Sequence, residues 1–288
     1  MCIFNVFIFL LVKKSDIIYF TFLLHMILLL LSILFIYLIY LTCQKYIKNN
    51  INIYDWHCKN IYPFNKKLTN IEQKYIKKCI EVSYWEIFRP FYIKSDPFIK
   101  RLSYFTYSHR IKDNINSSRL AYGSVICPKS IYIYAKEVLK ERKIICEIEP
   151  NDNYIFGGLG WDIQSGYFKI YFRFINHKNL STEYKKLLPY NLKNIWDSGL
   201  LSITYDNNGN ILEKKIYTYL KNEMVVELKS DKRHDIQRDI RDKNNNWETK
   251  LSNEGCKILK IYEKSGYKLD TIMFKNNINY TLYFPMIG

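Results

Sequence analysis

The residues best suited to chemistry lie in one short segment, GYFKIYFRF, residues 166–174. Side chains alternate between the two faces of a β-strand, so this segment presents two different faces. One face is apolar and suits a core; it consists of Phe168, Ile170, Phe172 and Phe174. The other face is cationic and aromatic; it consists of Lys169, Tyr171 and Arg173. Such a face is typical of a lining around a ligand.

The same polar and aromatic pattern recurs in two later segments. In ILEKKIYTYL, residues 211–220, one face consists of Glu213, Lys215, Tyr217 and Tyr219. In YTLYF, residues 280–284, Thr281 and Tyr283 share a face. In a sheet with one solvated face, these residues simply contact water. In a closed sheet they face one interior, where lysines stabilise a departing diphosphate and tyrosine rings shelter a carbocation from water.

Hairpins are the elements that must position these faces. Strand pairs joined by short polar turns are predicted at 154–174, 200–220 and 267–284. Further strands are predicted at 144–149 and 224–229, and helices at 70–88, 134–143, 182–196 and 251–265. Residues 98–134 are ambiguous, and residues 231–243 are predicted to be a charged helix or a loop. Helices packed on one face of an antiparallel sheet give an α+β fold, and the sheet forms a barrel if its edges meet.

The N-terminal region, residues 1–43, is strongly apolar. Its residues 17–43 carry His25 as their only possible charge and exceed the ~18 residues that cross a bilayer as a helix. A secretory signal peptide is the competing interpretation. No small-residue cleavage site follows the apolar run, which favours a retained transmembrane anchor, with Met1 or Met26 as the start.

Lysines concentrate after this span, in a basic juxtamembrane linker expected at 44–68. The positive-inside rule then predicts a single-pass anchor with the globular domain, residues 69–288, in the cytoplasm. The whole chain has 43 Lys and Arg against 27 Asp and Glu, a formal net charge of +16. That charge favours anionic partners: a membrane surface, nucleic acid or a phosphorylated small molecule.

Metal and nucleotide chemistry are not indicated by the sequence. The seven cysteines include no CxxC pair and there is no HExxH motif, so no metal site and no cofactor are expected. No DDxxD motif is present to hold magnesium on a diphosphate. GGLG at 157–160 lacks the Gly-Lys-Ser/Thr of a nucleotide-binding loop, which argues against a kinase or an ATPase.

Three segments resemble a known enzyme family: GWDIQSGYFKIYF, ILEKKIYTYL and YTLYFP. They are similar to the aromatic prenyltransferases of the ABBA class, especially the indole-type enzymes, over residues 155–285. This resemblance implies five antiparallel hairpins that close a barrel, with helices outside. It also implies metal-independent transfer of an allylic prenyl group from a prenyl diphosphate to an aromatic small molecule.

The positions that match the family supply candidate roles. Diphosphate binding is assigned to cationic side chains: Lys169 and Lys215 by resemblance, and Arg173 because it shares a face with Lys169. Shielding of the cation is assigned to Tyr171, Tyr217, Tyr219 and Tyr283. Glu147 is the candidate catalytic group that orients or deprotonates the acceptor. Two positions depart from the family, since Glu213 stands where it has Arg and Thr281 where it has Gln.

The chain ends at Gly288, just after the third matched strand, so the family's last hairpin is expected to be missing. Two other functions remain open. One is a non-catalytic, membrane-tethered basic α+β module that binds anionic lipid or nucleic acid. The other is a structural membrane protein without a small ligand. Convergence of the polar stripes on one interior favours an enzyme or a small-ligand carrier, whereas stripes that face water favour the module.

Overall fold

The computed structural model describes residues 22–42, 44–45, 68–83, 105–112, 115–123, 128–190, 192–221, 225–232, 234–240, 246–264, 269, 271–276 and 279–285. The chain splits into two compact units, Met1–Asn49 and Asn50–Gly288. In the first unit, the helix Phe22–Thr42 has 21 residues and a mean hydropathy of 2.8 over its most apolar window. It is therefore long and apolar enough to cross a membrane.

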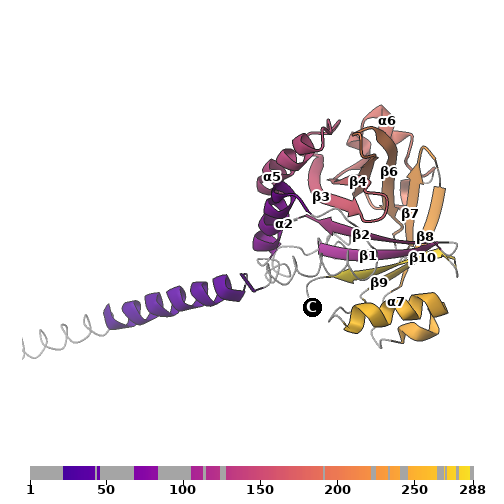
Figure 1. Cartoon of the computed structure of the whole chain (residues 1–288). Helices are drawn as coiled ribbons and strands as arrows, with labels where there is room; N and C mark the ends of the chain where they lie inside the picture. The colour runs from indigo at the N-terminus through magenta and orange to yellow at the C-terminus, as the bar shows by residue number, and fades with distance from the viewer. Residues whose placement is uncertain are drawn as a thin grey trace, which may run out of the picture. The chain divides into compact units, whose positions relative to one another are not determined.

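In the second unit, the described residues form ten antiparallel strands (Figure 1). They are β1 Phe105–Lys112, β2 Ile115–Tyr122, β3 Tyr154–Asp162, β4 Phe168–Phe174, β5 Gly199–Tyr205, β6 Ile211–Tyr219, β7 Val225–Ser230, β8 His234–Ile240, β9 Thr271–Asn276 and β10 Asn279–Pro285. Each strand pairs with its neighbours in the chain, and β1 also pairs with β10. The sheet therefore closes into a barrel, and the predicted α+β fold is confirmed.

The ring contains five hairpins, so the expectation of a missing last hairpin is wrong for this chain. The hairpin β1–β2 lies within 98–134, where the sequence predicted no defined element. The strand predicted at 224–229 is confirmed as β7, whereas its partner β8 lies inside 231–243, which was predicted to be a charged helix or a loop. β8 is a strand because both of its neighbours pair with it; Arg238 lies opposite Val225 on β7 and opposite Phe274 on β9. Pairing partners thus override the charged composition of the segment.

The helices are α2 Asn70–Ser83, α5 Pro128–Glu141, α6 Thr182–Lys185 and α7 Asn253–Lys264, and 3-10 turns lie at η2 His177–Asn179, η3 Leu192–Asn194 and η4 Trp247–Thr249. The predictions at 134–143 and 251–265 are confirmed with small shifts of bounds. The long helix predicted at 182–196 is wrong, because only α6 and η3 form there. The predicted helix at 70–88 forms as far as Ser83, and residues 84–88 lie outside the described part.

The strand predicted at 144–149 is also wrong, because these residues follow α5 as an irregular segment with a bend at Glu147 and no ladder partners among the described residues. Its alternating apolar pattern has another cause. Ile144 and Ile148 are buried against the barrel wall, whereas Ile145 between them is 87% exposed. A short alternating run of this kind predicts one buried face, but it does not establish that a neighbouring strand is present.

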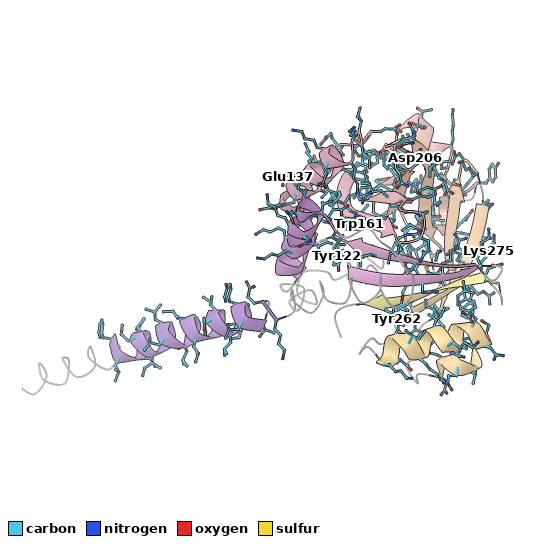
Figure 2. All side chains as sticks on the ribbon, viewed as in Figure 1. Tyr122, Glu137, Trp161, Asp206, Tyr262 and Lys275 are labelled. Carbon is cyan, nitrogen blue, oxygen red and sulfur yellow. The ribbon has the colours of Figure 1, made fainter. Side chains whose placement is uncertain are left out.

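The apolar faces of the strands point outward, beneath the helices. α2 and α5 lie side by side over β2 and β3, and α7 lies beside β9 and β10 (Figure 1). Tyr75 of α2 packs on Trp161 with ring centroids 6.1 Å apart, and Tyr262 of α7 stacks on Phe284 at 3.9 Å. Figure 2 labels Trp161 beneath the first helical layer and Tyr262 on α7. All four apolar residues of β4 are fully buried in this layer: Phe168, Ile170, Phe172 and Phe174. The polar and aromatic faces must therefore point into the barrel.

Candidate ligand site inside the barrel

The strand register continues the polar face of β4 from one strand to the next. Lys169 lies opposite Gly160 on β3 and Thr204 on β5. Thr204 in turn lies opposite Glu213 on β6. Directly paired residues in an antiparallel sheet point to the same face, so these side chains form one layer of the inner wall.

A second layer lies next to the first along the strands. Tyr171 pairs with Ser202 on β5, and Ser202 pairs with Lys215 on β6. Further along, Arg173 pairs with Leu200, which pairs with Tyr217. Lys169, Tyr171 and Arg173 thus each belong to a separate layer of one inner face.

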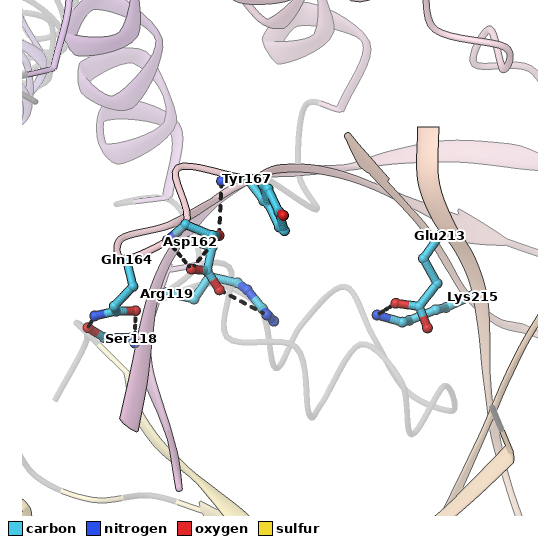
Figure 3. A network of polar contacts seen from close by, with 8 residues as sticks. Ser118, Arg119, Asp162, Gln164, Tyr167, Glu213 and Lys215 are labelled. Atoms are coloured by element: carbon cyan, nitrogen blue, oxygen red, sulfur yellow. Dashed lines mark hydrogen bonds and ion pairs between the residues drawn. The ribbon is translucent and has the colours of Figure 1, made fainter. Parts of the chain in front are cut away.

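The opposite side of the ring completes the same face through two residues that sequence analysis did not assign. Arg119 of β2 pairs with Asp162 of β3, and the closest atoms of their charged groups are 3.9 Å apart. Ser108 of β1 pairs with both Arg119 and Tyr283. Figure 3 shows the Arg119–Asp162 pair and the Glu213–Lys215 pair facing each other from two different walls.

The predicted lysine and tyrosine site residues converge in this interior. Tyr171 hydrogen-bonds to Arg119 and lies close enough to Tyr217 to affect its own pKa. Tyr283 likewise lies close to Tyr171, Tyr217 and Arg119, and Tyr219 packs against Tyr171 and Tyr217. Lys169, Lys215 and these five side chains, four tyrosines and Arg119, therefore face the same interior, which favours an enzyme or a small-ligand carrier over a charged outer surface.

Burial makes the two interior lysines chemically unusual. Lys169 is 6% exposed and Lys215 is 3% exposed, and the ammonium group of Lys215 is paired with the carboxylate of Glu213. Burial lowers the pKa of Lys169 well below its ordinary value, and the positive charges of Arg119 and Lys215 lower it further. A negatively charged ligand in the interior would relieve both effects, so Lys169 is suited to bind an anion.

Burial shifts the pKa of the interior tyrosines upward, opposite to its effect on Lys169. Burial raises the pKa of Tyr171, and it raises the pKa of Tyr283 beyond the range in which phenols ionise in water. Both phenols are therefore neutral at physiological pH and serve as hydrogen-bond donors and as ring faces. The ring of Tyr171 lies against Gly160, where an added Cβ would be 3.1 Å from its Cε2 atom. A glycine at this position leaves room for the ring of the neighbouring strand.

Glu147 does not belong to this group. It lies outside the barrel, where its carboxylate pairs with Lys214 at 2.6 Å and accepts a hydrogen bond from the hydroxyl of Tyr184 at 3.3 Å. Lys214 follows the inward residue Glu213 on β6 and so points to the outer face. The assignment of Glu147 to catalysis depended on a strand at 144–149, and that strand is absent from the described structure.

Two further residues of the interior, Arg119 and Asp162, were missed by sequence analysis. Arg119 lies in the segment 98–134, which lacked a clear periodicity. Asp162 lies in GWDIQSG, directly before the turn of a predicted hairpin, and it also caps that turn by accepting hydrogen bonds from the backbone and the hydroxyl of Ser165. The alternation Gly160-x-Asp162 was the available signal for an inward carboxylate.

No protein-family model, no curated protein and no solved structure matches this chain.

The depressed pKa of Lys169 predicts a pH-dependent stability difference. Below this pKa, Lys169 is protonated in both the folded and the unfolded state, and the buried charge destabilises the fold in full. As the pH rises from that pKa towards the ordinary value of 10.5, the folded state loses the proton first and the destabilisation is removed. The variant Lys169→Met should therefore be more stable than the wild type at neutral pH, and its advantage should vanish near pH ~10.

Lys214 on the same sheet provides the control with opposite sign. Partial burial lowers its pKa, but hydrogen bonds to Glu147 and Glu183 outweigh that effect and raise it. Lys214→Met should therefore be less stable than the wild type at neutral pH. Denaturant midpoints of the full chain in detergent, measured at several pH values, test both statements. Equal pH profiles for Lys169→Met and the wild type would show that Lys169 is not buried as described.

Proposed function

We propose that the barrel binds an allylic prenyl diphosphate in its interior and transfers the prenyl group to an aromatic acceptor. One observation carries the proposal: lysine, arginine and tyrosine side chains from separate hairpins converge on one inner face of a closed barrel. Cations suit the diphosphate, and ring faces suit an allylic cation. The resemblance to ABBA-class prenyltransferases, with their five-hairpin barrel, supports the same function.

In this reaction, the bond between the allylic carbon and the diphosphate oxygen breaks, and the electron pair leaves with the diphosphate. Lys169, Lys215 and Arg119 stabilise that leaving group through charge-assisted hydrogen bonds. The faces of Tyr171, Tyr217 and Tyr283 stabilise the allylic cation and keep water from it. A ring carbon of the acceptor then forms the new carbon–carbon bond and releases its proton.

A carboxylate inside the barrel is needed to accept that proton, and Glu213 is the one that the ligand itself makes available. In the described structure, Glu213 is engaged by Lys215. A diphosphate competes for the same ammonium group and frees the carboxylate. Glu213, which stands where the resembled family has Arg, thus becomes the proton acceptor in place of Glu147.

The helix Phe22–Thr42 supports a second part of the proposal, namely that the enzyme is held at a membrane. We place the barrel on the cytoplasmic side, because lysines outnumber acidic residues in 44–68. Protease accessibility in sealed vesicles of known orientation tests this placement. A protease pattern that places the barrel in an organelle lumen or outside the cell would contradict it.

The test of the chemistry is calorimetric titration of the full chain, in detergent micelles, with geranyl diphosphate. We expect a Kd in the micromolar range, about −8 kcal/mol, and weaker binding of geraniol, which lacks the diphosphate. Binding should also take up protons from the buffer, because an anion raises the depressed pKa of Lys169. Absence of heat and of competition by inorganic diphosphate would overturn the proposal. Binding without transfer to any of a panel of indoles and phenols would indicate a carrier instead.

A further inference from the structure

A second candidate site lies outside the barrel, under the connection between β4 and β5. It is a hollow of ≈ 930 Å³ bordered by η2, α6 and η3, on the side of the barrel that carries α6 (Figure 1). It is an open surface hollow and not an enclosed cavity, so it suits a headgroup that stays partly in water. Its wall is strongly basic and contains Lys178, Lys185, Lys186, Lys193, Lys221 and Lys229. Among the lining residues, Asp197 is the one carboxylate.

A buried histidine in this wall points to a missing acceptor. His177 is 5% exposed, and its Nδ1 atom has no hydrogen-bond partner among the described residues. The nearest carboxylate oxygen, Oδ1 of Asp197, is 3.8 Å away, which is too long for a hydrogen bond. Buried polar atoms without partners are uncommon and mark places where a ligand or an ion completes the structure. An anionic oxygen in the hollow would supply that partner.

The rim of the hollow is aromatic and aliphatic. Tyr190 is 97% exposed, and the ammonium group of Lys229 lies 4.6 Å from the centre of its ring. The same ammonium group donates a hydrogen bond to the carbonyl of Leu188 at 3.2 Å, which fixes the loop that carries Tyr190. Leu192 beside it is 40% exposed. Lysines next to an exposed tyrosine and an exposed leucine are typical of surfaces that lie at a membrane interface.

We infer that this hollow binds the phosphate headgroup of an anionic phospholipid and docks the barrel domain on a membrane surface. The lysines and His177 contact the phosphate oxygens, and Tyr190 and Leu192 enter the interfacial layer. The apolar helix in the same chain favours lipid over nucleic acid, because it brings a bilayer within reach of the domain. Single-stranded nucleic acid is also usually held by several successive aromatic side chains, whereas Tyr190 is the single aromatic residue that lines this hollow.

The experiment is a lysine footprint of the full chain in nanodiscs, made of phosphatidylcholine alone or with phosphatidylserine added. Acetylation of Lys185, Lys186 and Lys193 should slow by about five-fold or more in the anionic discs. Lysines of other helices should react equally in both discs; suitable ones are Lys74, Lys257 and Lys260, which are 56%, 75% and 63% exposed. Both leaflets have the same composition, so the orientation of the anchor does not affect the result.

Charge reversal separates this site from a general attraction of a basic protein to anionic lipid. Exchanging the three hollow lysines 185, 186 and 193 for glutamate should abolish the protection of Lys178 and Lys221, whereas the same exchange at 74, 257 and 260 should leave it intact. Equal acetylation rates in both discs would overturn the inference. Protection of the hollow by an oligothymidine and not by phosphatidylserine would also overturn it, in favour of nucleic acid. Neither result depends on prenyl diphosphate binding in the barrel.

Discussion

Binding of geranyl diphosphate should weaken about 10–100-fold when Lys169 is replaced by methionine, and it should be unchanged when Lys214 is. Lys169 is buried in the interior, and a charge-assisted hydrogen bond in such a place cannot be replaced by water. Methionine fills a similar volume without a charge, so the barrel should stay folded. Lys214 lies on the outer face of β6 and pairs with Glu147 and Glu183, so its loss does not alter the interior.

Lys215 requires a compensated variant, because removing it alone would take the ammonium partner from the partly buried carboxylate of Glu213. Lys215→Met alone should lose both stability and binding. Combined with Glu213→Gln, the same change should recover stability while binding stays weak. Titration and thermal denaturation of these variants in detergent separate the two effects. If Lys169→Met and the double variant Lys215→Met, Glu213→Gln both bind with wild-type affinity, then the diphosphate does not bind in the interior.

The hairpins that carry the candidate site were predictable from the sequence because their information is local. Alternation over residues 168–174 and 211–219 fixes two faces, and Gly and Asn in the connecting turns fix the pairing of adjacent strands. The same alternation also showed which residues of each strand belong together. It did not show which face is inside, since an apolar face packs equally well against helices outside a barrel or against a second sheet.

Closure of the barrel was not predictable, because it depends on a contact between strands far apart in the chain. β1 pairs with β10, so that His109 lies opposite Leu282. β1 itself, FTYSHRIK, has an apolar alternation of Phe105, Tyr107 and Ile111 in its sequence. Buried His109 interrupts this alternation, and Arg110 and Lys112 occupy positions of the other face. Arg119 on the following strand was missed for the same reason. The prediction for Glu147 is wrong because the apolar alternation of 144–149 reflects one buried side of an irregular segment and not a strand.

Replacing Glu72 with alanine should be the most destabilising single change in the helical layer, by about 3–5 kcal/mol. Glu72 of α2 is 2% exposed. Its Oε1 atom accepts hydrogen bonds from the guanidinium of Arg142, after α5, and from the indole nitrogen of Trp161 on β3 at 2.9 Å. Its Oε2 atom accepts from the backbone of Thr69, whose hydroxyl accepts from the backbone of Glu72 in return. One carboxylate thus joins two helices, a strand and a helix cap.

Without Glu72, the charge of Arg142 loses this carboxylate, although the side chain is only 12% exposed. The guanidinium also remains packed on the ring of Phe168, 4.7 Å from its centre. For a domain of this size, the expected fall in Tm is roughly 6–20 °C. Glu137→Ala is the matched control, because Glu137 and Lys74 join the same two helices through an exposed ion pair, worth ~0–1 kcal/mol.

Removal of both charges, by Glu72→Gln with Arg142→Met, should recover much of the loss, since no buried charge then lacks a partner. Thermal denaturation of the full chain in detergent measures all three variants.

If Glu72→Ala melts within a degree or two of Glu137→Ala, then α2 is not held on the barrel by this carboxylate. The helical layer over β3 and β4 would in that case open more easily. Ligand binding should then be compared between the wild type and Glu72→Ala. If the large difference is found, the helical layer that buries the outer face of β3 and β4 is rigid, and the polar side chains of those strands are held towards the interior where the proposed chemistry takes place.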